Sequence, residues 1–185
     1  INVPKLGTIG IHPSLLPKYR GPTPIQTAIL NGETETGITL FQMDQEIDHG
    51  KIIANCKSQI ADQTYKDLET ELAKLSAELF IEIMPRFLKG EVKVLAQDES
   101  ESTYTKKFRI QDGYIKPEDL KKAQEDGGEI ALKIERKIRA LNPEPGVWTE
   151  KENKRLKLLA AKLENKKIIL TKIQYAGKNA LALKD

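Results

Sequence analysis

Residues 7–53 read GTIGIHPSLLPKYRGPTPIQTAILNGETETGITLFQMDQEIDHGKII, and this stretch decides the fold of the first half of the chain. Side chains alternate faces along a strand, so residues 7–11 predict a short strand that ends at His12. Four prolines between residues 13 and 24 then exclude regular structure and predict a stiff loop. The imidazole of His12 is therefore expected at a strand end, next to that loop.

The helices and strands after the loop are predicted from the spacing of apolar residues and from the positions of glycine and proline. A short helix is expected to end at Asn31-Gly32, because glycine favours the left-handed conformation at a helix end. The turn Asp48-His49-Gly50 separates two strand-like runs, so it is expected to hold its side chains at the strand ends, where Asp48 can meet His12. The predicted elements are a helix over residues 25–30, strands over 37–43 and 51–60, and an amphipathic helix over 63–87 with Leu68, Leu72, Leu75, Leu79 and Ile83 on one stripe.

Composition places the chain among ordinary globular proteins. It has 185 residues, of which 39% are hydrophobic and 31% are charged, enough for one large or two small domains. No apolar run approaches the roughly 18 residues that a membrane helix needs. One cysteine, Cys56, excludes an internal disulfide and a multi-cysteine metal site.

Charge is distributed unevenly along the chain. Residues 1–103 hold 10 Lys and Arg against 15 Asp and Glu, whereas residues 104–185 hold 20 against 12, a net of −5 and +8. A basic module favours a polyanionic partner, because phosphates supply most non-specific affinity for nucleic acids. A solvated lysine-rich surface explains the charge equally well.

The second half predicts a separate, β-rich module. A segment rich in Ser, Thr and charge over residues 97–113 is typical of a linker. An amphipathic helix is predicted over residues 129–141 and is stopped by Asn142-Pro143. The strands expected after it are a hairpin of residues 156–163 and 167–174 and a last strand near 180–183.

Residues 7–53 as a whole resemble the folate-dependent formyltransferases, and within them the methionyl-tRNA formyltransferases. The run Ile138-Arg139-Ala140-Leu141-Asn142-Pro143, with Gly146 and Arg155-Leu156-Lys157, is similar to the carboxyl-terminal domain of that family. The resemblance implies an α/β fold with a partial Rossmann-like sheet and helices, followed by a small OB-like domain. The expected domains are residues 1–96 and 114–185, with the second one abridged.

The resemblance also implies the chemistry: a formyl group moves from 10-formyltetrahydrofolate, a co-substrate, to an amine, with no metal. This requires a neutral amine, a polarised carbonyl and a stabilised oxyanion. A histidine suits the task because its ordinary pKa near 6.5 allows proton transfer near neutrality, and a carboxylate can orient the ring. His12 is the expected catalytic polariser and proton donor, and Asp48 is its partner and a base through water.

The expected folate-binding residues match the family at Ser14, Leu15, Leu16, Pro17 and Gly50, where Asp48 and Gly50 belong to a loop around the pterin. The alternative for residues 14–17 is a plain proline-rich turn. His49 is interpreted as a loop residue or a substrate contact. Lys18 and Arg20 are interpreted either as guides for phosphate or the folate tail, or as exposed solvated charges.

Two features depart from the family pattern. Relatives carry Asn two residues before the histidine, where its amide helps hold the oxyanion, and this chain has Gly10. Loss of one such donor typically costs about 3 kcal/mol. Relatives also have a preceding half-domain that completes the folate pocket, so the chain is expected to be a partial product.

Three functions remain open. The first is formylation of methionyl initiator tRNA in translation initiation, by a cytoplasmic monomer that does not bind membranes. The second is another folate-dependent N-formyltransferase: a glycinamide ribonucleotide enzyme, disfavoured because such enzymes lack the appended domain, or one that acts on an amino-sugar nucleotide. The third is a non-catalytic module that holds RNA, in which Gly10 marks a decayed site.

Overall fold

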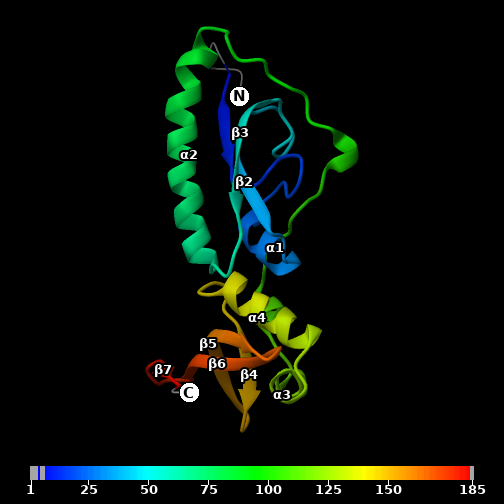
Figure 1. Cartoon of the computed structure of the whole chain (residues 1–185), viewed down its shortest axis with the longest axis vertical. Coiled ribbons are helices and arrows are strands. Elements are labelled where there is room, and N and C mark those ends of the chain that lie inside the picture. The colour runs from blue at the N-terminus through cyan, green and yellow to red at the C-terminus, as the bar shows by residue number, and fades with distance from the viewer. Residues whose placement is uncertain (1–3, 5–6, 184–185) are drawn as a thin grey trace. The chain divides into compact units, whose positions relative to one another are not determined.

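The structure is a computed structural model that describes residue 4 and residues 7–183. The chain divides into two compact units, Ile1–Lys107 and Phe108–Asp185 (Figure 1). The division falls inside the segment 97–113 that was expected to be a linker. Among the described residues, no helix is both long enough and apolar enough to cross a membrane.

The first unit is built on a three-stranded sheet. Its strands are β1 (Ile9–His12), β2 (Glu35–Gln42) and β3 (Ile52–Gln59), paired in the order β1-β2-β3 and all antiparallel. The central strand β2 is buried along almost its whole length. Its Thr39 lies opposite His12 in the register of β1. The predicted strands are confirmed, and the register brings the end of β1 beside the middle of β2.

Two helices complete this unit. α1 (Pro24–Asn31) begins with proline at its first position, which needs no N–H donor, and ends at Gly32 with a left-handed φ of 70°. α2 (Tyr65–Leu88) begins with a capping box between Thr64 and Asp67. α2 packs against β2, β3 and α1. Its buried stripe is the predicted one, although Leu75 is half-buried; the buried members are Leu68, Leu72, Leu79 and Ile83.

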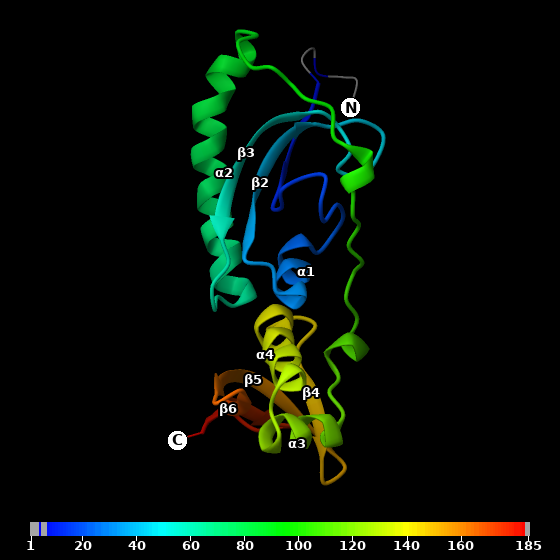
Figure 2. The same cartoon turned by 45° about the vertical axis from the view of Figure 1, so that its right-hand side comes forward.

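The chain after α2 returns along the side of the sheet that is opposite to α2. Both views show this return, which carries residues 97–106 past the loop between β1 and α1 (Figure 2). The segment is ordered by hydrogen bonds to that loop, for example from the backbone N–H of Arg20 to the carbonyl of Thr103 at 2.9 Å. Residues 97–106 therefore belong to the first unit by their contacts.

The second unit is a four-stranded antiparallel sheet with two helices. The strands β4 (Trp148–Lys151), β5 (Lys154–Glu164), β6 (Lys167–Tyr175) and β7 (Leu181–Ala182) pair in that order. Helix α4 (Glu129–Leu141) matches its predicted range and packs on β5 and β6. Helix α3 (Pro117–Glu125) was not predicted, although Pro117 and the acidic first turn are helix-start signals. The α/β class with a β-rich second domain is confirmed, and the OB-like barrel stays a prediction.

Candidate active site

The two predicted catalytic side chains lie together. His12 is the last residue of β1, and Asp48 lies in the loop between β2 and β3. Nδ1 of His12 is 3.5 Å from Oδ2 of Asp48. The His12 side chain is 6% exposed and that of Asp48 is 21% exposed. The ring is therefore buried, while the carboxylate stays open to solvent on one side.

The ring of His12 has a fixed orientation. Its Nε2 lies 2.8 Å from the backbone carbonyl of Tyr19, and because a carbonyl can only accept, Nε2 carries the proton in this bond. Nδ1 is then the ring atom that faces Asp48. One nitrogen is thus used for orientation, and the other is left for a reacting group.

Asp48 is held by the loop that follows His12. The backbone N–H of Gly21 donates to Oδ2 of Asp48 at 2.7 Å. Asp48 itself has a left-handed φ of 51°, a conformation that few residues other than glycine adopt without surrounding support. The bond from Gly21 supports this conformation and fixes where the carboxylate points.

The expected folate loop, residues 14–17, is locked from within. Ser14 is buried, and its hydroxyl donates to the carbonyl of Lys18 at 2.6 Å. The hydroxyl of Thr39 donates to the carbonyl of Ser14 at 2.7 Å and accepts from the N–H of Leu16 at 3.1 Å. Leu16 is buried, whereas Leu15 and Pro17 are half-buried. The last two therefore have side-chain surface left for a ligand.

Gly50 needs to be glycine because its loop lies directly against β2. Its φ does not lie in the left-handed region, so freedom of φ is not the reason. A Cβ on Gly50 would instead lie 1.6 Å from the carbonyl oxygen of Gln42. The loop passes so close to β2 that no side chain fits at position 50. Asp48 and His49, the two preceding residues, therefore lie near the end of β2.

Gly10 is also confined by its neighbour. It pairs with Phe41 across β1 and β2, and a Cβ on Gly10 would lie 2.4 Å from Cε1 of the Phe41 ring. Phe41 is buried at 3% exposure, so its ring has little room to move. The asparagine that the family resemblance places here would therefore not fit beside the ring in this position.

Arg20 and two residues that the sequence did not single out, Gln97 and Glu99, support the site. The Nε2 amide of Gln97 donates to the carbonyls of Asp48 at 2.9 Å and Gly50 at 2.8 Å. Arg20 is fully buried and forms a bidentate pair with Glu99, at 2.6 and 2.9 Å. Neither expected role of Arg20 fits this burial, because its guanidinium is consumed by the pair. The hydrogen bonds to Glu99 raise the pKa of Arg20, and the same pair lowers the pKa of Glu99.

His49 joins the loop to its surroundings rather than lying free. Its Nδ1 is 2.6 Å from Oδ2 of Asp44, and its Nε2 is 3.5 Å from Oε1 of Glu99. The hydrogen bond with Asp44 is the main cause that raises the pKa of His49, and it lowers the pKa of Asp44. Among the described residues, no group of three or more His, Cys, Asp or Glu side chains lies close enough together to hold a metal ion.

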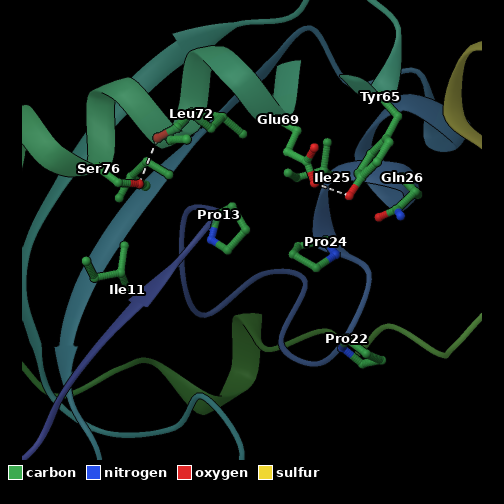
Figure 3. A pocket seen from close by; sticks show the side chains of 12 residues that line it. Ile11, Pro13, Pro22, Pro24, Ile25, Gln26, Tyr65, Glu69, Leu72 and Ser76 are labelled. Carbon is green, nitrogen blue, oxygen red and sulfur yellow. Dashed lines mark hydrogen bonds between the residues drawn. The ribbon is translucent and has the colours of Figure 1, made fainter. Parts of the chain in front are cut away.

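A cavity of about 330 Å³ lies beside this site but does not include the catalytic pair. It is mostly apolar, with Ile11 and Ser76 toward one end and the hydrogen-bonded pair Tyr65 and Glu69 toward the other (Figure 3). Burial and the hydrogen bond to Glu69 raise the pKa of Tyr65 to about 12. Because successive strand residues face opposite sides, Ile11 lines the cavity while His12 points away from it. The cavity and the pair are separate features.

Comparisons with known proteins show which family the chain resembles. The formyl transferase family matches residues 1–84, and the family of the formyl transferase carboxyl-terminal domain matches residues 128–185, together more than half of the chain. Methionyl-tRNA formyltransferase from Kosmotoga olearia is 41% identical over 160 residues, 86% of this chain and 48% of the relative. The enzyme of that name from Chloroflexus aggregans is 38% identical over 162 residues, 87% of this chain and 49% of the relative.

A solved structure shares the fold. The N-formyltransferase from Helicobacter canadensis, in complex with folinic acid and dTDP-3-aminofucose, superposes with a TM-score of 0.68 at 25% identity, over 85% of this chain and 55% of that one. The chain spans about half the length of the curated relatives it matches.

Proposed function

Since this chain belongs to the formyl transferase family, we propose that it serves the transfer of a formyl group from 10-formyltetrahydrofolate to the amino group of methionyl initiator tRNA, in translation initiation in the cytoplasm. The supporting observation is the His12–Asp48 pair, with Nδ1 and Oδ2 3.5 Å apart at adjoining strand ends. The two curated relatives described above carry the name of this activity.

The pair can divide the proton transfers between its members. When bound, the folate co-substrate supplies the formyl carbon and a nitrogen leaving group. Asp48 is partly exposed and can take the proton that the attacking amine loses, directly or through water. Because Nε2 is already protonated and bonded to the Tyr19 carbonyl, His12 donates from Nδ1 as the imidazolium. Its Nδ1 proton faces the oxygen that becomes negative and then passes to the leaving nitrogen. Asp48 returns the proton of the amine to Nδ1, which restores both groups.

Residues 14–17 and Gly50 are proposed to hold the folate. The residues present fit such a ligand in a specific way: the backbone of the loop is already locked by Thr39, so binding costs little ordering. The contacts then fall to the half-buried Leu15 and Pro17. Ser14 and Leu16 shape the loop, and the close approach of Gly50 to Gln42 keeps the facing loop in place.

The second unit is proposed to bind the tRNA. This unit, residues 108–185, carries 18 Lys and Arg against 12 Asp and Glu. Each phosphate contact by a basic side chain releases counterions, so this role predicts affinity that falls steeply with salt. The whole protein is proposed to act as a monomer.

The decisive assay offers 10-formyltetrahydrofolate with methionyl initiator tRNA to the intact protein, and in parallel with a dTDP-linked amino sugar. Formylation of the tRNA that is lost in His12→Ala and in Asp48→Ala is expected. A second candidate, amino-sugar N-formylation, is favoured by the fold shared with the Helicobacter canadensis enzyme. Formylation of the sugar alone would establish it, and salt-dependent tRNA binding with no formylation of either acceptor would show a non-catalytic RNA-binding module.

A further inference from the structure

Residues 97–106, called the strap below, lie along the loop that follows His12 and bond to it repeatedly. The hydroxyl of Thr103 accepts from the N–H of Tyr19 at 2.8 Å, the residue whose carbonyl orients His12. Thr105 donates its N–H to the carbonyl of Arg20 at 2.8 Å. The strap therefore holds the segment that provides the backbone partners of both His12 and Asp48.

Gln97 extends this hold to the loop of Asp48. Its amide nitrogen donates to the carbonyls of Asp48 and Gly50, the two residues on either side of His49. Its amide oxygen accepts from Arg20, from Nη2 at 2.7 Å and from Nε at 3.2 Å. The buried guanidinium can only donate, so it dictates which end of the amide faces the loop.

Apart from the contacts of His49 with Asp44 and Glu99, the loop has few other side-chain restraints. Met43 is 41% exposed and Ile47 is 67% exposed, so the apolar side chains of the loop add little packing. The side chain of His49 is one-third exposed. The position of the Asp48 backbone thus depends on Gln97, on the close approach of Gly50 to β2 and on the Gly21 amide, together with the bond between His49 and Asp44.

We propose that the strap is part of the active site and that Gln97 is a positioning residue, which sets the Asp48 carboxylate relative to His12. Gln97 does not touch the reacting atoms; it acts through two backbone carbonyls of the loop. The proposal rests on the proposed function for its effect on turnover, whereas its structural part can be tested independently of activity.

The test uses Gln97→Glu in the intact protein. Glutamate keeps an acceptor for Arg20 but replaces the donor that faces Asp48 and Gly50, so the fold is retained while the loop loses its two bonds. Gln97→Ala removes both the donor to the loop and the acceptor for Arg20, and it serves as the second variant. The matched control is Gln59→Ala, an exposed glutamine at the end of β3 and outside both loops of the site.

Two readouts are expected to change together in Gln97→Glu. Amide hydrogen exchange at Gly21, which donates to Asp48, becomes at least 10-fold faster, while exchange at Leu40 in β2 is unchanged. The kcat for formylation falls at least 10-fold with KM within 2-fold, and Gln59→Ala behaves as the unsubstituted protein. A purely structural role predicts instead that Gln97→Ala loses stability and that Gln97→Glu changes neither readout, which would overturn the proposal.

The outcomes also separate this proposal from the proposed function. Faster exchange at Gly21 in a protein that formylates no acceptor would support the strap and reject the formyl transfer. Wild-type exchange and wild-type kcat in Gln97→Glu, with an active protein, would reject the strap alone.

Discussion

The two loops that carry the catalytic pair are built differently. The loop after His12 is locked by its own hydrogen bonds and by Thr39, with Ser14, Leu16 and Arg20 buried. The loop of Asp48 is more exposed and is held from outside, by Gln97 and by the Gly21 amide. The difference indicates that the imidazole is the fixed member of the pair and that the carboxylate depends on distant parts of the chain.

Removal of the fixed member is expected to have the largest effect. His12→Ala should lower kcat by about 10³-fold, because proton donation and oxyanion stabilisation are lost together. Its stability should fall by about 1–3 kcal/mol, because the buried ring leaves a cavity and the Tyr19 carbonyl loses its donor. Steady-state kinetics with a thermal unfolding control checks this. Activity within 10-fold of the unsubstituted protein would show that His12 is not the polariser.

The second largest effect is expected from a substitution that crowds the contact between β2 and the Asp48 loop. Gly50→Ala places a methyl group into the Gln42 carbonyl, and no flexible side chain can give way there. The free energy of unfolding should fall by about 3 kcal/mol, and the loop should move. Urea denaturation measures it. A matched control is Gly90→Ala, where a Cβ would meet nothing within 4 Å, although its φ of 73° adds backbone strain; an equal loss in both variants would refute the proposed clash.

Restoring the family asparagine tests the packing beneath the site. Gly10→Asn should destabilise the protein by about 2 kcal/mol, because the buried Phe41 ring occupies the space. The double variant Gly10→Asn with Phe41→Leu should recover part of that loss. Chemical denaturation of the four proteins of this cycle measures the coupling, and additive effects would mean that the ring moves aside freely.

The smallest expected effect is the pH dependence of the exposed loop. Pairing raises the pKa of His49, so its contribution is present below the ordinary histidine value and is lost as the pH rises through the higher folded value. The lowered pKa of Asp44 means that the contribution is also lost when the pH falls through the folded aspartate value. Between these limits the pair should add less than about 1 kcal/mol, since both side chains are substantially exposed.

The measurement compares unfolding of the unsubstituted protein and of Asp44→Asn at about pH 5.5 and about pH 8.5, on either side of the ordinary histidine pKa. The gap in the free energy of unfolding should be present at the lower pH and closed at the higher one. A gap that is equal at both would show that the ionisation of His49 does not stabilise this loop.

The sequence predicted those parts of the site that depend on neighbouring residues in the chain. The strand ending at His12, the turn at Asp48 and helix α4 all follow from period, proline and glycine within a few residues. Helix α3 was missed because it is short and strongly polar, so its caps were the main signal. The steric need for glycine at position 50 could not be predicted, because a close approach to Gln42 leaves no mark in the sequence of either residue.

The support of the site could not be predicted in the same way. The buried Arg20 is paired with Glu99, which lies 79 positions further along the chain. No residue pattern near either position predicts that pair. The strap has the Ser, Thr and charge content of a solvated connection, and its contacts are mostly to backbone groups. Such bonds satisfy buried donors and acceptors without requiring a periodic apolar pattern.

A double-mutant cycle between His12 and Asp48 tests the central claim most directly. If the two side chains act as one proton-transfer unit, His12→Ala, Asp48→Ala and the double variant should show similar losses in kcat, because removing either member disables the pair. Losses that multiply in the double variant would mean that the two groups act independently, which would contradict the pair as the catalytic centre.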